Sequence, residues 1–369
     1  MRGRVAAHLT RFQMASRKVL CFIVARNFGD ITFMSTYFRE LAARGYADEY
    51  IVWTRAPMGF LFDGIPNCTV LYSKFPVGSF GNFRWRDCLA FLRSAWNVRR
   101  MRPTVSLDMV GDFRERFFAR LIGSHRHLHI GWTREHPHRG IIRTPFGVGR
   151  PAVLVGPETP SVYAAYTRFV DYLLREAGLA DRPGPLPPLR THEAVPTVGL
   201  HPSASQACKL WPQSHWTQLT QALLGAGVDV VAFGAPGERD ALEAQFASFG
   251  DRVRISTGSI PEFARELARL DVLVGLDSFS VHMAENVGTP SVMIVGPNDP
   301  ALFAPPRAAV LSDSGGCAAW PCYNRPSCVG TAGEYVCIRS ISVARVQAAV
   351  AERLLASRAA EEQVSDVAC

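Results

Sequence analysis

A single lysine stands among polar residues in the segment HPSASQACKLWPQSHW, residues 201–216, between a strand-like run and a helix-like run. A mobile ammonium in such a loop can bind a phosphate as a point charge, and a helix that starts near Ser214 adds positive potential from its backbone N–H groups. Lone lysines are also common on protein surfaces. From spacing alone, Lys209 is therefore either a phosphate ligand or an ordinary surface residue.

Three further polar loops follow buried strand-like runs in the second half of the chain, beginning at Gly234, Gly275 and Gly296. Parallel strands end at one edge of a doubly wound sheet, and ligands bind there. We therefore expect these loops and the one at His201 to converge, although they span about a hundred positions.

The first half of the chain also alternates between strands and helices. A buried strand is expected at 18–25, followed by NFGD as a turn and by a helix over 31–45 that ends at Gly45. Five prolines in 182–196 preclude a helix or a central strand there. We expect an α/β protein with an N-terminal domain (1–181), a Pro-rich linker (182–196), a C-terminal domain (197–348) and a C-terminal helix and tail (349–369).

The formal charge is +8 and unevenly spread: residues 1–150 hold 24 Lys and Arg against 10 Asp and Glu. The asymmetry indicates either an anionic partner, such as a phosphorylated lipid surface, or solvated surface arginines. No zinc-finger, helix-turn-helix or RRM signature is present, which argues against nucleic acid as a partner. Apolar runs such as VLCFIVA are too short to span a bilayer. We expect a cytoplasmic protein, or one peripheral on the inner face of the plasma membrane.

Several motifs in one order resemble glycosyltransferase family 9, the ADP-heptose lipopolysaccharide heptosyltransferases. They are NFGD, HPSA, KLWP and Trp216, then DSFSVHMAENVGTPSVMIVGP at 277–297 and DP at 299–300. The resemblance covers roughly 18–348 and implies a GT-B fold, in which two Rossmann-like doubly wound domains face a central cleft. It also implies transfer of a heptose-like sugar from a nucleotide diphosphate donor, with ADP-heptose as the expected donor. The acceptor would be a lipopolysaccharide core or related anionic glycolipid, reached through contact of the basic N-terminal domain with the inner membrane.

The resemblance assigns roles to individual residues. Asp30 corresponds to the catalytic base, and Lys209 to the lysine that contacts the donor phosphates. The donor-binding positions implied in this way are Ser203, Lys209, Glu238, Asp277, Ser278 and His282. Glycosyl transfer needs a base for the incoming hydroxyl and positive charge on the departing diphosphate. No D-x-D triad stands in a plausible loop, so we expect an inverting, metal-independent reaction with no required cofactor.

Each assignment has a plain structural alternative. Asp30 and Asp277 could cap the helices that follow them, and His282 could be a core histidine. Phe279 departs from the family pattern, which usually has glycine at this position, and its ring would limit the approach of the backbone to a phosphate. The donor pocket is therefore expected to differ in shape.

Four cysteines lie within 21 residues: Cys317, Cys322, Cys328 and Cys337. They could hold a structural zinc or iron, but the gaps lack tight C-x2-C pairs, so reduced thiols are favoured. A subgroup of the family that heptosylates autotransporter proteins carries a cysteine-bound iron. A protein (autotransporter) O-heptosyltransferase is therefore one alternative function, and a non-catalytic sugar-nucleotide-binding protein is another. The cysteines not expected to be ligands are Cys21, Cys68, Cys88, Cys208 and Cys369.

Histidines at 125, 127, 129, 136 and 138 are interleaved with Arg126, Arg134 and Arg139. Histidine clusters can bind metals, but the mixture with arginine favours a strip that faces an anion.

Overall fold

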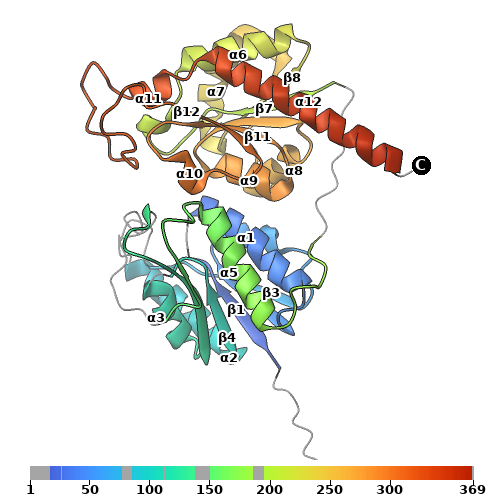
Figure 1. Ribbon diagram of the computed structural model, residues 1–369, viewed down its shortest axis with the longest axis vertical. Coiled ribbons are helices and arrows are strands. Elements are labelled where there is room, and N and C mark those ends of the chain that lie inside the picture. The colour runs from blue at the N-terminus through green and yellow to red at the C-terminus, as the bar shows by residue number, and fades with distance from the viewer. Residues whose placement is uncertain are drawn as a thin grey trace, which may run out of the picture.

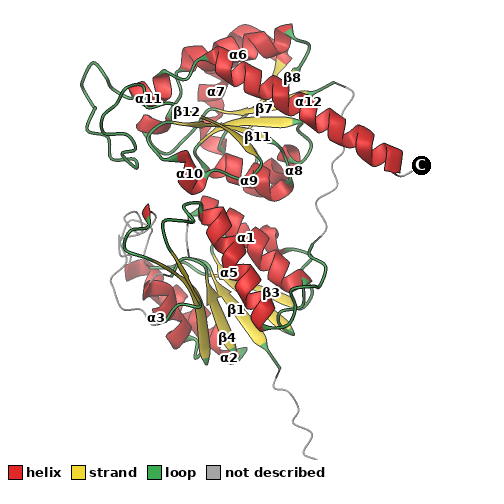
Figure 2. Cartoon of the chain, viewed as in Figure 1, coloured by secondary structure: helices red, strands yellow, loops and turns green. Residues whose placement is uncertain are grey.

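The computed structural model describes residues 17–25, 27–76, 85–111, 113–137, 150–185 and 195–367. It contains two α/β domains, one above the other in Figure 1, each built on a six-stranded parallel sheet. Helices cover both faces of each sheet, as the colouring of Figure 2 shows. The expected fold class is confirmed.

The N-terminal sheet has the strand order β3-β2-β1-β4-β5-β6. Its strands are β1 (Val19–Ile23), β2 (Glu49–Thr54), β3 (Cys68–Tyr72), β4 (Val105–Asp108), β5 (Arg126–Trp132) and β6 (Val153–Val155). One face packs against α1 (Phe28–Ala43), the short η1 (Met58–Phe62) and α5 (Val162–Glu176). The other face packs against α2 (Cys88–Arg100) and α3 (Phe113–Leu121). The short η2 (Trp85–Asp87) directly precedes α2.

The C-terminal sheet has the strand order β12-β11-β10-β7-β8-β9. Its strands are β7 (Thr197–His201), β8 (Asp229–Phe233), β9 (Val253–Ser256), β10 (Val272–Leu276), β11 (Ser291–Val295) and β12 (Ala308–Ser312). One face packs against α6 (Gln213–Gly225), α7 (Arg239–Phe246) and α12 (Val343–Val367). The face toward the N-terminal domain packs against α8 (Ile260–Leu267), α9 (Phe279–Val287) and α10 (Pro300–Phe303). The short helices are η3 (Ala207–Lys209), η4 (Pro236–Glu238), η5 (Ala247–Arg252) and α11 (Val336–Arg339).

Both sheets therefore share one topology, because each runs 3-2-1-4-5-6 when its own strands are numbered along the chain. In this topology the order of the strands reverses between the first and fourth strands, and ligands bind beside the carboxyl ends of those two strands. In the N-terminal domain the switch point lies between β1 and β4. In the C-terminal domain it lies between β7 and β10.

The two domains contact each other along α1 and α9. The side-chain amide nitrogen of Asn286 donates to the Thr32 carbonyl oxygen at 3.1 Å and to Ser35 Oγ at 3.0 Å. The rings of Phe28 and Phe279 lie 6.3 Å apart, edge to face. A single buried apolar cluster runs through both domains. The start of α9 is therefore held against the start of α1.

Two expected boundaries differ from the structure. Helix α1 begins at Phe28 with Asn27 as its N-cap, so NFGD forms the first helical turn and does not precede it. It ends at Ala43, two residues before the expected end at Gly45, which has φ +70° and follows the C-cap Arg44; Gly45 N–H donates to the Ala42 carbonyl and Tyr46 N–H to the Leu41 carbonyl. Helix α12 spans the expected boundary at 348/349, and its first half packs in the C-terminal core.

Two further expectations concern the linker and the membrane. Residues 186–194 of the expected linker lie outside the described residues. Within the described ranges, no helix has the length and apolar character needed to cross a bilayer.

Candidate functional site

Lys209 and Asp277 form a buried ion pair across the switch point of the C-terminal sheet. Lys209, in the loop after β7, donates from Nζ to the Asp277 carbonyl oxygen at 2.8 Å and to its carboxylate Oδ2 at 3.0 Å. Only 14% of the Lys209 side chain and 6% of the Asp277 side chain are exposed. Lys209 is therefore not a surface lysine, and the two loops predicted to converge are in contact.

Asn298 completes this pair and was not singled out from the sequence. Its Nδ2 donates to the same Asp277 Oδ2 that accepts from Lys209. The residue is 4% exposed, and within the described part of the chain its Oδ1 has no hydrogen-bond partner. Asn298 comes from the loop after β11, which was expected at this edge. The sequence thus predicts the position of the loop but not the role of Asn298, because an asparagine in a GPNDP turn looks like an ordinary turn residue.

Helix α9 begins directly after the pair. Ser278 is its N-cap with extended backbone, and Asp277 lies one position earlier, so Asp277 does not cap the helix. The first backbone N–H groups of a helix lack intrahelical partners and attract anions. Ser278 Oγ lies 3.2 Å from Ser280 Oγ. The ring of Phe279 packs between Phe28, at 6.3 Å, and Phe263, at 6.0 Å.

Asp30 lies in the first turn of α1, three positions after the N-cap Asn27, and is partly exposed. It is therefore not the N-cap. The neighbouring Gly29 faces α9: a Cβ built there would lie 3.5 Å from His282 Cδ2 and 3.9 Å from Phe279 Cα. The structure thus brings the NFGD turn to the start of α9, at the carboxyl end of β1.

His282 joins the two domains. Its Nδ1 lies 2.8 Å from the hydroxyl of Tyr163 on α5, and its ring lies 5.4 Å from that of Phe33. Burial lowers the pKa of His282 to about 4; the Asp277 carboxylate opposes this shift and the Lys209 ammonium adds to it. The imidazole is neutral at pH 7, and the Lys209 charge acts close to this contact between the domains. Tyr163, like Asn298, could not be found from the sequence, since only the folded chain pairs it with His282.

Glu238 and Ser203 lie on the loops after β8 and β7. Glu238 Oε2 accepts the Ala235 N–H at 2.7 Å, which stabilises the turn of η4. Its carboxylate also acts on the half-buried His201, where it opposes the lowering of the imidazole pKa by desolvation. Ser203 is half-buried. The structure places both loops at the ligand-binding edge of the sheet, whereas their donor-binding roles remain predictions.

The four clustered cysteines border one small cavity of about 20 Å³, and Cys208 joins them. The loop that carries them packs on the loop after β11, because Trp320 Nε1 donates to the Gly296 carbonyl at 2.8 Å and Cys322 N–H donates to the Pro297 carbonyl at 3.0 Å. Cys208, not expected to belong to this group, directly precedes Lys209. The cysteine cavity therefore adjoins the Lys209–Asp277 pair.

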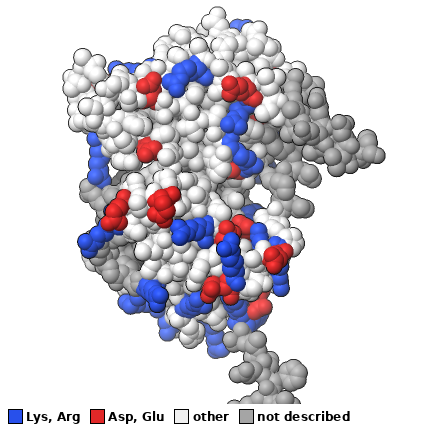
Figure 3. Space-filling model, in the orientation of Figure 1, with Lys and Arg blue, Asp and Glu red and all other residues white. Residues whose placement is uncertain are grey.

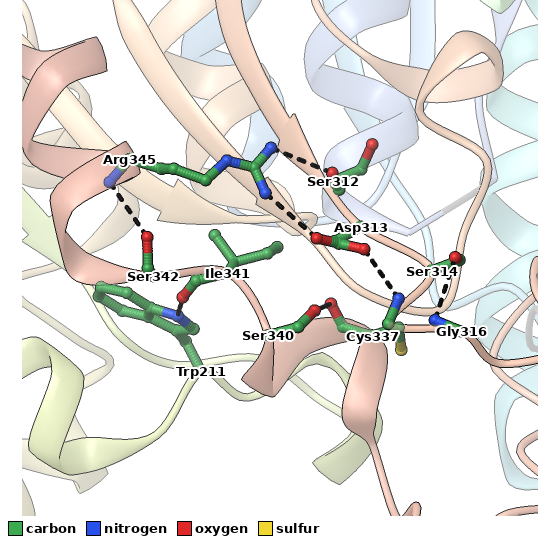
Figure 4. A network of polar contacts seen from close by, with 11 residues as sticks. Trp211, Ser312, Asp313, Ser314, Gly316, Cys337, Ser340, Ile341, Ser342 and Arg345 are labelled. Atoms are coloured by element: carbon green, nitrogen blue, oxygen red, sulfur yellow. Dashed lines mark hydrogen bonds and ion pairs between the residues drawn. The ribbon is translucent and has the colours of Figure 1, made fainter.

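The ends of the cysteine loop are held together, as Figure 4 shows. Arg345 at the start of α12 donates to Asp313 Oδ2 at 3.4 Å and to the Ser312 carbonyl at 3.3 Å. Burial raises the pKa of Cys337 to about 11 and also raises that of Cys208. Among the described residues, no three His, Cys, Asp or Glu side chains are placed to hold a metal ion.

A second basic site lies in the N-terminal domain, at the predicted strip of His and Arg. A pocket of about 290 Å³ between α3 and β5 is lined by Arg116, Ala119, Arg120, Ser124, His125, His127, His129 and Arg150. Burial lowers the pKa of His127 to about 3 and lowers that of His129 as well, so the arginines supply the positive charge. His136 instead packs on Trp132 and donates from Nε2 to the Thr159 carbonyl oxygen at 3.0 Å. His138 and Arg139 lie outside the described residues.

In sequence, part of the chain that includes most of the C-terminal domain is similar to known proteins. Residues 175–327 match the family model "Glycosyltransferase family 9 (heptosyltransferase)". Lipopolysaccharide heptosyltransferase 1 of Escherichia coli K12 is 28% identical over 148 residues, which are 40% of this chain and 41% of that relative. The aligned part of the chain thus spans less than half the length of the curated relative.

The fold comparison extends over both domains. The structure of E. coli ADP-heptose LPS heptosyltransferase II is similar with a TM-score of 0.63 at 19% identity, covering 92% of this chain and 99% of that one. E. coli heptosyltransferase WaaC with ADP is similar with a TM-score of 0.60 at 13% identity, covering 90% and 97%. The GT-B fold is therefore confirmed over both domains, and residues 175–327 are similar in sequence to glycosyltransferase family 9.

Proposed function

We propose that this chain is an inverting, metal-independent glycosyltransferase that moves a heptose-like sugar from a nucleotide diphosphate donor to a lipopolysaccharide core or related envelope acceptor. ADP-heptose is the first candidate donor, since the similar heptosyltransferases are described with ADP-heptose or ADP. The observation that carries the proposal is the buried Lys209–Asp277 pair at the switch point, next to the start of α9.

The leaving group would be stabilised by Lys209 and by α9. An ammonium has three N–H donors, and Asp277 accepts from Lys209 at two oxygens, so a third N–H can donate to a phosphate oxygen. The orphan N–H groups at the start of α9 provide further donors for the diphosphate. Asp277 and Asn298 would then act as positioning residues that fix the ammonium. Together these groups supply the positive potential that the departing diphosphate needs.

The acceptor would be activated from the other domain. In the proposed step, the Asp30 carboxylate accepts the proton of the acceptor hydroxyl, the hydroxyl oxygen bonds to the anomeric carbon, and the bond from that carbon to the phosphate oxygen breaks. The electron pair of the broken bond leaves with the nucleotide diphosphate. A single displacement of this kind inverts the configuration at the anomeric carbon.

The acceptor class separates this proposal from its alternatives. An autotransporter O-heptosyltransferase would use the same donor groups with a polypeptide acceptor, and the five cysteines beside the donor loop favour it as the second candidate. A sugar-nucleotide-binding protein without catalysis would not need Asp30.

The test combines donor binding with product analysis. The purified full chain is screened by thermal shift with ADP-heptose, GDP-sugars and UDP-sugars, and then incubated with the best donor and either a lipopolysaccharide core acceptor or a polypeptide acceptor. We expect stabilisation by ADP-heptose and a heptosylated glycolipid by mass analysis. A heptosylated polypeptide would establish the second candidate instead. Stabilisation without product would indicate a binding protein, and no stabilisation by any donor would overturn the donor site.

A further inference from the structure

A stripe of large apolar side chains lies exposed on α2 and on η2, which leads into it. Trp85 is 80% exposed, Leu89 82%, Leu92 51% and Trp96 61%. The spacing of four, three and four residues places them on one face of a helix. The opposite face carries Phe91, Ser94, Ala95 and Val98, which are buried against the sheet. The helix thus has two apolar faces, and only one of them is covered.

Helix α3 also exposes large apolar side chains. Phe113 is 46% exposed and Phe117 58%, one helical turn apart. The two helices lie side by side, since the rings of Phe91 and Phe118 are 4.9 Å apart and Arg99 Nη1 donates to the Leu121 carbonyl at 3.2 Å. We call the six side chains at 85, 89, 92, 96, 113 and 117 the α2–α3 apolar stripe. Large apolar side chains gathered on neighbouring exposed helices mark an interaction site.

The charge around the stripe is one-sided. Seven arginines belong to the same three elements: Arg86, Arg93, Arg99, Arg100, Arg114, Arg116 and Arg120. Their only acidic residues are Asp87 and Glu115, and Glu115 is buried. Arg116 and Arg120 also line the pocket beside β5. Arg150 lines the same pocket, so the basic surface continues there. Figure 3 shows basic side chains prevailing at the lower end of the N-terminal domain.

We infer that the α2–α3 apolar stripe and its arginines form a docking surface for an anionic lipid bilayer. Tryptophan, leucine and phenylalanine insert at the boundary of headgroups and acyl chains, and arginines bind lipid phosphates. A second copy of this chain fits less well, because a two-fold contact through the stripe would bring the arginines of both copies together. The pocket between α3 and β5 would accept a headgroup phosphate, with the 6% exposed His129 at its wall.

The orientation suits a membrane-bound acceptor. A helix that connects two parallel strands runs antiparallel to them, so α2 and α3 begin at the edge where β1 ends and Asp30 follows. The stripe therefore starts near the edge of the sheet that carries the proposed base. This inference deepens the proposed function and rests on it for the acceptor, whereas bilayer binding itself needs neither donor nor transfer.

The experiment measures vesicle binding of the full chain without donor or acceptor. Flotation is compared between vesicles of phosphatidylcholine alone and vesicles in which about a third of the lipid is phosphatidylglycerol. We expect binding to the anionic vesicles only, weakened by salt because exposed charges are screened. Leu89→Glu with Trp96→Glu and, separately, Arg93→Glu with Arg100→Glu should each weaken it at least about tenfold, which corresponds to about 1.4 kcal/mol.

Matched controls keep the test decisive. Leu355→Glu changes a 71% exposed leucine on α12, and Arg239→Glu changes an arginine that is 49% exposed on α7; both should leave vesicle binding unchanged. Trp96→Phe, which keeps an apolar ring, should also retain it. Circular dichroism and thermal shift with ADP verify that each variant is folded.

Three outcomes would overturn the inference. They are equal binding to both vesicle types, binding unaffected by Leu89→Glu with Trp96→Glu, and concentration-dependent dimers that this variant abolishes while vesicles are not bound. A chain that binds anionic vesicles but no nucleotide sugar would retain the docking surface and lose the proposed function, so the two failures are distinguishable.

Discussion

Lys209 Nζ and Asp277 Oδ2 are 3.0 Å apart, and both belong to loops that leave the carboxyl ends of neighbouring parallel strands, β7 and β10. Both side chains are nearly buried, so the attraction between the two charges replaces the water that each has lost. Breaking a buried pair by removing one partner costs more than the pair itself contributes, because a bare charge is left behind.

This dependence predicts the stability of variants. Lys209→Met should lower the free energy of unfolding by about 3 kcal/mol, because the Asp277 carboxylate is left buried. The double variant Lys209→Met, Asp277→Asn should recover most of that loss. Urea unfolding of the wild type, both single variants and the double variant measures the coupling. Equal losses that simply add would contradict a tight pair.

The same lysine has a predicted kinetic role. If it stabilises the departing diphosphate, Lys209→Ala should lower turnover by about a hundredfold or more and weaken donor binding less. Lys209→Arg should rescue only in part, since a planar guanidinium differs in shape from a compact ammonium. Steady-state kinetics and ADP titration separate the two effects. Wild-type turnover and affinity in Lys209→Ala would remove the role.

Asp30→Asn tests the base. The change keeps size and shape but cannot accept the acceptor proton, so turnover should fall by about a hundredfold or more while donor affinity stays nearly constant. Asp63→Asn, at an exposed aspartate of the same domain, is the matched control and should keep full turnover. A parallel loss of nucleotide affinity in Asp30→Asn would indicate a structural role at the start of α1.

These residues differ in how far the sequence could predict them. Lys209 and Asp277 could be placed at one sheet edge because strand-like runs and loops repeat, and the parallel topology brings successive loops together. Helix α1 starts three residues earlier than the sequence predicts, because Gly29 and Asp30 have turn-like character although they lie in the first helical turn, after the N-cap position at Asn27. Asn298 and Tyr163 act only through tertiary contacts, with Asp277 and with His282. No local sequence pattern predicts such partners.

The α2–α3 apolar stripe shows a different limit. Its positions have helical spacing, and a sequence with Phe91 and Val98 on the other face supports either face as the buried one. Only the packing of Phe91 on Trp53 and Phe118 determines which face the sheet covers. The charge excess of residues 1–150 is compatible with an anionic partner or with solvated surface arginines, and only the fold shows which elements carry these arginines.

The cysteine cavity predicts a metal content. Because no three described ligands are placed around one point, protein purified without chelator should contain well under one equivalent of zinc or iron. Metal analysis by mass spectrometry measures this directly. A full equivalent that disappears in Cys317→Ser, Cys322→Ser would contradict the expectation and favour the polypeptide-modifying alternative. Cys68→Ser, in β3 of the other domain, is the control and should leave the metal content unchanged.

His282 makes the contact between the domains sensitive to acid. Its pKa is about 4 in the folded chain, below the ordinary value of 6.5, so the unfolded chain binds more protons between these values. The folded state is therefore not penalised by this group above about pH 6.5, and its stability decreases as the pH falls toward 4. By linkage, the free energy of unfolding is lower by about 2 kcal/mol at pH 5.

The measurement compares melting temperatures at pH 7.5 and pH 5.0. The acid-induced decrease should be smaller in His282→Gln than in the wild type, because the variant has no imidazole to protonate at that contact. Tyr163→Phe removes the hydroxyl beside Nδ1 but keeps the titrating ring, so its decrease should stay close to that of the wild type.

His127→Gln, whose histidine also titrates far below its ordinary range, should reduce the decrease without involving the domain contact. If ADP protects against acid in His127→Gln but not in His282→Gln, the interdomain histidine couples donor binding to the contact between the two domains. Identical decreases in His282→Gln and the wild type would show that this imidazole does not bear the acid sensitivity.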